Sequence, residues 1–126
     1  MFFFKKKILI IDDDITARKM MAIRFQKLDK YKVLSASNGI EGIEVVEKEN
    51  PDIILLDWMM PNMNGLDVLR KLKKKSKTKD IPVLMLTAKN KMSEVEDALA
   101  LGANDYVTKP FNMGELARKV ESIIAN

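Results

Sequence analysis

The stretch ILIIDDD, residues 8–14, decides the fold. Four consecutive aliphatic residues are followed without a break by three aspartates. A continuous apolar run of this length is typical of a strand that is buried on both faces of a parallel sheet covered by helices. One aspartate is enough to cap a following helix, whereas three adjacent carboxylates repel one another. The other two therefore need a reason beyond local structure.

Strand-like and helix-like patterns alternate along the rest of the chain. Asp14 is a candidate N-cap for the first helix, and Asn50-Pro51 ends the second. These patterns predict one α/β domain over residues 1–126, a doubly wound five-stranded parallel sheet with five helices. The expected strands are 5–11, 31–36, 52–57, 81–86 and 105–107, and the expected helices are 15–29, 40–49, 66–75, 91–101 and 112–125. Residues 60–65, MPNMNG, are expected to form a loop. Phe2 to Phe4 either extend the first strand or are a non-native remnant.

The composition excludes several kinds of chemistry. The chain has no cysteine and no histidine, which excludes disulfides, thiolate or imidazole metal ligands, and Ser-His or Cys-His nucleophiles. A phosphohistidine within this chain is excluded for the same reason. No segment reaches the roughly 20 apolar residues of a membrane span, so the cytoplasm is the expected compartment.

The net charge of +4 comes from one short segment. Residues 70–79, RKLKKKSKTK, hold seven basic residues, and without them 15 basic and 18 acidic residues remain. Such a run suggests a nucleic-acid patch in some proteins. Lysines at the end of a helix also complement its dipole and keep the end hydrated. The second interpretation is favoured, so direct nucleic-acid binding is not expected.

Functional side chains gather at the carboxyl ends of the expected strands, where such sheets bind ligands. Asp12, Asp13 and Asp57 follow or end two of these strands, while Thr87 and Lys109 follow two others. Clustered carboxylates need a cation, and Mg²⁺ prefers their oxygen ligands. With an ammonium and a hydroxyl added, the cluster becomes a pocket for a phosphoryl group carried by an aspartate. Each residue alone has a structural explanation as a cap, a turn residue or a solvated lysine, and only their combination favours function.

The chain closely resembles the receiver domain of bacterial two-component response regulators. The matching segments are ILIIDDD at 8–14, DIILLDWMMPNMNG at 52–65, VLMLTAK at 83–89 and GANDYVTKPF at 102–111. The resemblance implies a flavodoxin-like fold with strand order 2-1-3-4-5. It is nearest to the single-domain kind of the chemotaxis regulator, because no sequence follows residue 126.

The resemblance also implies a role for each matching acidic position. Asp57 would be the phosphoacceptor. Asp13 would bind Mg²⁺ directly and Asp12 mainly through water. Asp57 and the backbone carbonyl of Met59 would complete the set of protein ligands.

The remaining roles implied by the resemblance concern the response to phosphorylation. Lys109 would pair with the phosphoryl oxygens, with a cis peptide bond before Pro110. Thr87 would hydrogen-bond the phosphoryl group, and Tyr106 would turn inward as Thr87 moves. The output face would be about 91–125. The implied partners are a sensor histidine kinase or phosphotransfer protein and a downstream protein target, and no conventional catalytic turnover is implied.

Three alternatives stay open. An aspartate-nucleophile phosphatase would need an acid two residues after Asp57, where Met59 stands. The chain is also compatible with a receiver excised from a longer DNA-binding regulator, or with a designed or reconstructed receiver.

Met59 and Lys89 lie two residues beyond Asp57 and Thr87. Both lack groups that position water, which suggests a long-lived phosphoryl state, although a purely structural role suits them equally.

Several of the nine methionines fit core positions, and others fit a partner surface. Met20, Met21 and Met85 are expected in the core. Met60, Met63 and Met92 lie in or near the predicted loops around the site, where contact with a partner is credible.

Overall fold

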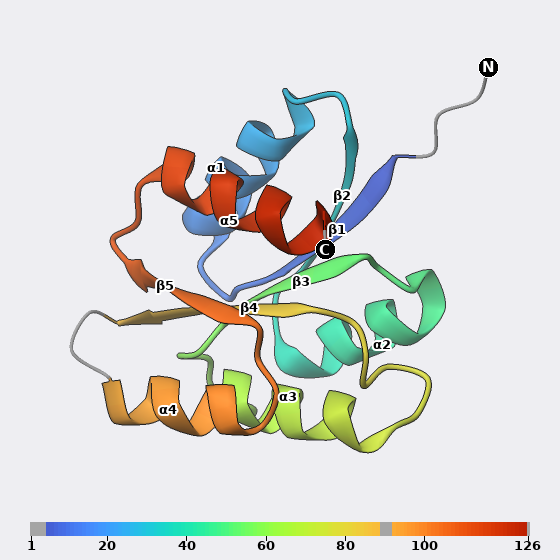
Figure 1. Cartoon of the computed structure of the whole chain (residues 1–126), viewed down its shortest axis with the longest axis vertical. Coiled ribbons are helices and arrows are strands. Elements are labelled where there is room, and N and C mark those ends of the chain that lie inside the picture. The colour runs from blue at the N-terminus through green and yellow to red at the C-terminus, as the bar shows by residue number, and fades with distance from the viewer. Residues whose placement is uncertain (1–4, 89–91, 126) are drawn as a thin grey trace.

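A computed structural model describes residues 5–88 and 92–125, in which five strands alternate with five helices (Figure 1). The predictions for Phe2 to Phe4 and for Lys89 lie outside these residues. None of the described helices is long and apolar enough to cross a lipid bilayer. The elements in chain order are β1 (Lys6–Ile11), α1 (Ile15–Gln26), β2 (Tyr31–Ala36), α2 (Gly39–Glu49), β3 (Ile53–Asp57), α3 (Gly65–Lys74), β4 (Val83–Ala88), α4 (Met92–Ala100), β5 (Asp105–Lys109) and α5 (Met113–Ala125).

The strands form one parallel sheet in the order β2-β1-β3-β4-β5. This confirms the predicted doubly wound, flavodoxin-like architecture with order 2-1-3-4-5. The order places β3 between β1 and β4, at the centre of the sheet. Because all the strands are parallel, the carboxyl ends of β1, β3 and β4 lie side by side at one edge.

Helices cover both faces of the sheet, with α1 and α5 on one side and α2, α3 and α4 on the other (Figure 1). The apolar run of β1 explains this layering, because successive side chains of a strand point to opposite faces. Leu9 and Ile11 belong to the core cluster beneath α2, α3 and α4, whereas Ile8 and Ile10 belong to the cluster beneath α1 and α5. All four are completely buried, as the sequence predicts.

Two strand boundaries differ from the prediction in a way that affects the site. β4 runs over Val83–Ala88 and β5 over Asp105–Lys109, so Thr87 and Lys109 are strand residues rather than residues of the following turns. The predicted start of β4 at Ile81 is wrong because Pro82 has no amide hydrogen to donate to a ladder. Thr87 is paired with Thr108 and Ala88 with Lys109 in the sheet register. The sheet backbone therefore fixes both side chains.

The first helix is shorter than predicted, and one of its methionines is misplaced. α1 ends at Gln26 rather than at 29, and Asp29 adopts a positive φ of 52° that turns the chain into β2. Met21 is fully buried, but Met20 is 58% exposed, which makes its core assignment wrong. Consecutive residues of a helix point about 100° apart, and in α1 the rotation of the helix turns Met21 toward the sheet and Met20 toward solvent.

The other methionine predictions have mixed outcomes. Met85 is buried, as predicted. Among the three assigned to loops near the site, Met60 is 8% exposed and part of the core, whereas Met92 is 50% exposed. Met63 is half-buried against the core beneath α2 and α3.

Candidate functional site

The predicted site residues meet at the carboxyl edge of the sheet. Asp12 directly follows β1, Asp57 ends β3 and Lys109 ends β5. Strand alternation sends these three side chains to the same side as the residues two positions before them. Those residues all belong to the core cluster beneath α1 and α5: Ile10, Leu55 and Val107.

Lys109 joins two of the carboxylates. Its Nζ lies 3.0 Å from Asp12 Oδ2 and 3.1 Å from Asp57 Oδ1. The side chains of Asp12 and Asp57 are 0% and 5% exposed, and that of Lys109 is 30% exposed. Burial lowers the pKa of Lys109, but the hydrogen bond to Asp12 and the charge of Asp57 outweigh it, so the net pKa is raised. The lysine therefore stays protonated and neutralises part of the acidic cluster. The Lys109–Pro110 peptide bond is cis.

Asp12, Asp13 and Asp57 form the one group of three or more acidic side chains in the described residues that could hold a metal ion. One carboxylate oxygen from each lies within 4.8 Å of the others. Asp13 is exposed, while Asp12 and Asp57 are buried, so the cluster opens toward solvent on one side. A hard divalent ion that keeps several water ligands, such as Mg²⁺, fits this set of oxygen donors.

The pKa of Asp57 is raised from 3.8 to about 7. Burial is the largest cause, followed by the neighbouring charge of Asp12, and the positive charge of Lys109 opposes both. The ionised form of Asp57 is therefore destabilised unless a further cation binds beside it. Together with its burial, this raised pKa distinguishes Asp57 from an ordinary surface acid.

Local hydrogen bonds hold the first of the three aspartates in place. The Asp14 backbone N–H donates to Asp12 Oδ1 at 2.9 Å, and Arg18 Nη1 donates to the Asp12 carbonyl at 2.8 Å. Asp14 itself caps α1, accepting from the amides of Thr16 and Ala17, as predicted. Sequence reasoning missed Arg18. Arg18 lies four residues after the N-cap of α1, which is one turn into the helix. This spacing could have indicated a contact with the preceding loop.

Thr87 reaches the same edge from β4. The residue is 1% exposed, and its Oγ1 has no hydrogen-bond partner among residues 5–88 and 92–125. A buried hydroxyl without a partner is costly in a protein interior.

Tyr106 lies on β5, opposite Met85 in the sheet register. Its ring is half-buried and packs against the core cluster beneath α2, α3 and α4. Thr87 is two residues beyond Met85, so both Thr87 and Tyr106 face this cluster. Lys119 of α5 lies 5.3 Å from the centre of the Tyr106 ring and donates to the Tyr106 carbonyl at 2.8 Å.

The loop after Asp57 folds back tightly onto the end of β3. The Gly65 amide donates to the Trp58 carbonyl at 2.9 Å, and Asn64 forms a capping box with Asp67 at the start of α3. A Cβ on Gly65 would lie 2.5 Å from the Asp57 carbonyl oxygen, so the close approach requires glycine. Sequence reasoning treated Gly65 only as a loop residue. Met59, in the same loop, has a side chain that is 63% exposed.

Comparison with known families shows which family the chain belongs to. A family model described as the response regulator receiver domain matches residues 8–121. The chain is a response regulator receiver domain. This match confirms the resemblance seen in the sequence.

Relatives of the receiver domain include both transcription factors and chemotaxis proteins. It is 40% identical over 119 residues to the phosphate regulon transcriptional regulatory protein PhoB of Pseudomonas aeruginosa, covering 94% of the chain and 52% of PhoB. It is 35% identical to the chemotaxis protein CheY1 of Helicobacter pylori, covering 94% of the chain and 96% of CheY1. The receiver domain thus spans about half the length of the transcriptional regulators that it matches and nearly all of CheY1.

Solved structures agree with the fold. The chemotaxis protein CheY4 of Vibrio cholerae superposes with a TM-score of 0.89 at 30% sequence identity, over 95% of this chain and 99% of that one. Receiver domains are phosphoryl-accepting signalling switches rather than conventional enzymes. They generally bind Mg²⁺ in an acidic pocket, and they interact with histidine kinases or phosphotransfer proteins and with downstream targets.

Proposed function

We propose that this receiver domain accepts a phosphoryl group on Asp57 in a Mg²⁺-dependent reaction and passes the signal on through α4, β5 and α5. The observation that carries the proposal is the convergence of three carboxylates within 4.8 Å of one another, with Lys109 3.0 Å from Asp12 and 3.1 Å from Asp57. The domain has no histidine, so the donor would be a phosphohistidine of a partner kinase or phosphotransfer protein.

In the proposed transfer, a carboxylate oxygen of Asp57 attacks phosphorus and forms a P–O bond. The P–N bond to the donor imidazole breaks, and the imidazole leaves with the bonding electron pair. The carboxyl must be ionised to attack, so the raised pKa of about 7 for Asp57 would make the transfer depend on pH near neutrality. Lys109, already within hydrogen-bond distance of Asp57, would shift its contact to a phosphoryl oxygen.

Asp13, Asp57 and the Met59 backbone carbonyl would hold Mg²⁺ directly, with Asp12 acting mainly through water. When bound, the ion neutralises the carboxylates and the charge on the phosphoryl oxygens. The exposed position of Asp13 supports this assignment, because a ligand that faces solvent leaves room for the bound waters that Mg²⁺ retains.

The switch would act through Thr87 and Tyr106. A phosphoryl group adds about −1.5 to −2 charges and three acceptor oxygens, and the unpartnered Thr87 hydroxyl is a donor for one of them. Movement of Thr87 would free space that Tyr106 enters from the neighbouring strand. The surface that then changes carries two exposed apolar side chains of α4, Met92 at 50% and Leu99 at 41%.

The phosphodonor would dock over α1. Ile15, Met20 and Ile23 are each more than half exposed and lie within an arc of about 140° on this helix. Ile15 directly follows the three aspartates, so this apolar strip begins at the rim of the site. Such a strip supports contact with a helical kinase or phosphotransfer domain.

Mass spectrometry after treatment with acetyl phosphate and Mg²⁺ tests the proposal. We expect one phosphoryl group, mapped to Asp57, and none without Mg²⁺ or in Asp57→Asn. Asp29→Asn, which removes an exposed carboxylate far along the chain from the site, is the matched control and should label normally. Labelling at another residue, or undiminished labelling of Asp57→Asn, would remove Asp57 from its role.

A second candidate concerns the whole protein rather than this site. PhoB is about twice as long as the region that the receiver domain matches. If this domain is part of a similarly long regulator, it would control a DNA-binding output. The mass of the protein isolated from its native source separates this case from a single-domain regulator.

A further inference from the structure

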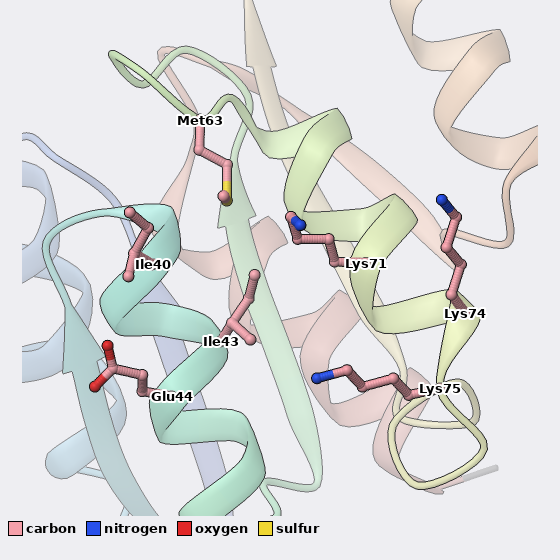
Figure 2. A pocket seen from close by; sticks show the side chains of 7 residues that line it. All are labelled: Ile40, Ile43, Glu44, Met63, Lys71, Lys74 and Lys75. Atoms are coloured by element: carbon pink, nitrogen blue, oxygen red, sulfur yellow. The ribbon is translucent and has the colours of Figure 1, made fainter.

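An open groove of about 430 Å³ lies between α2 and α3, away from the aspartate cluster (Figure 2). Ile40 and Ile43 of α2 line one side, three lysines of α3 and its C-terminal end line the other, and Met63 lies at one end. None of these residues takes part in the site described above. The groove also contains part of the basic run 70–79, which the proposed function leaves unexplained.

The floor of the groove is apolar. Ile40 is 59% exposed, and Ile43 and Met63 are half-buried. Ile40 and Ile43 are three residues apart in α2, so they form one stripe along that helix. Figure 2 places both of them on the α2 side of the groove. An apolar stripe of this kind gains free energy when another apolar surface covers it.

Contacts between α2 and the end of α3 join the two walls of the groove. Lys75 Nζ pairs with Glu47 Oε1 at 2.8 Å, and Lys77 Nζ donates to the Glu47 carbonyl at 3.2 Å. These bonds tie the end of α3 to α2.

The basic rim carries charge that the domain does not use internally. Lys71 and Lys74 are exposed, and neither forms an ion pair or hydrogen bond with any residue in 5–88 or 92–125. By contrast, Arg70 pairs with Asp67, and Lys73 donates to the carbonyl of Lys79. The free cations of α3 thus border the apolar floor.

We propose that this groove binds an acidic amphipathic helix of a partner protein. The apolar face of that helix would cover Ile40, Ile43 and Met63, and its carboxylates would pair with Lys71 and Lys74. A groove between two helices, lined by an i, i+3 apolar pair, matches helix-in-groove recognition. A nucleic acid would leave the apolar floor of Ile40, Ile43 and Met63 uncovered, which argues against it as the occupant.

The test uses a synthetic helical peptide with leucines along one face and glutamates along one flank, labelled with fluorescein. Anisotropy gives its affinity, and ¹⁵N NMR shows which amides shift. We expect shifts to concentrate at Ile40, Ile43 and Lys71, with affinity that falls as salt rises. The double variant Lys71→Glu/Lys74→Glu should bind about tenfold more weakly, and Ile40→Ser should also weaken binding.

The matched control is Lys6→Glu/Lys32→Glu, which makes the same change in net charge at exposed positions of β1 and β2 and should leave peptide affinity unchanged. All variants should keep their circular dichroism spectrum and their labelling at Asp57, so this test and that of the phosphoryl site can fail separately. The proposal is overturned if no groove amide shifts, or if the control pair weakens binding as much as the groove pair. It is also overturned if duplex DNA or phosphatidylglycerol vesicles compete the peptide off the groove lysines.

Discussion

Replacing the carboxyl of Asp57, the proposed phosphoacceptor, with an amide should stabilise the metal-free domain, by an amount that depends on pH. Asp57 is 4% exposed, and its pKa is raised from 3.8 to about 7. The folded state therefore holds this proton more tightly than the unfolded chain does. As pH rises from about 4 to about 7, the folded state must give up a proton that the unfolded chain has already lost, and stability falls.

The size of this effect follows from the raised pKa. One pKa unit corresponds to about 1.4 kcal/mol, so ionised Asp57 costs the folded state about 4 kcal/mol above pH 7. The amide introduced by Asp57→Asn would keep the shape of the neutral carboxyl and still accept a hydrogen bond from Lys109. We expect Asp57→Asn and the unsubstituted domain to have similar free energies of unfolding near pH 4 and to differ by about 4 kcal/mol near pH 8.

Urea unfolding followed by circular dichroism, in EDTA and across this pH range, measures the difference. Asp29→Asn is the matched control, since its side chain is 93% exposed and, among the residues that the structure describes, pairs only with Lys5 at the surface. It should show no comparable gap. Excess Mg²⁺ should stabilise the unsubstituted domain more than Asp57→Asn. The electrostatic reasoning would be refuted if the free energies of unfolding of Asp57→Asn and the unsubstituted domain differed equally at both ends of the pH range. A lower free energy of unfolding for Asp57→Asn at high pH would also refute it.

Three further substitutions test other parts of the site. Asp13→Ala should suppress the change in Trp58 fluorescence on adding Mg²⁺, and an unchanged titration would argue against Asp13 as a metal ligand. Thr87→Ala should still be labelled by acetyl phosphate but lose most of the chemical-shift changes that labelling causes in α4 and β5; a full response would exclude the hydroxyl from the switch. Gly65→Ala should lower the free energy of unfolding by about 1–3 kcal/mol, because its Cβ would lie 2.5 Å from the Asp57 carbonyl oxygen, and urea unfolding at neutral pH gives the value directly.

Properties that depend on neighbours in the chain could be predicted from the sequence. The apolar run of β1, the N-cap at Asp14, the boundaries of β2 and the end of α2 follow from local pattern and capping chemistry. The placement of aspartates at strand ends follows from the same patterns, because parallel strands all end at one edge of a sheet. The sequence by itself therefore determined the architecture and the edge at which the site would form.

Other properties required the folded arrangement. Met20 and Met21 are the same residue type and adjacent in the sequence, and only the orientation of α1 on the sheet buries Met21 and exposes Met20. Lys109 contacts Asp12 across a separation of 97 residues, and no local pattern specifies which carboxylates one lysine will bridge. The raised pKa of Asp57 and the groove between α2 and α3 likewise exist only when distant elements pack together. Burial and charge proximity act through space, so the tertiary structure alone decided them.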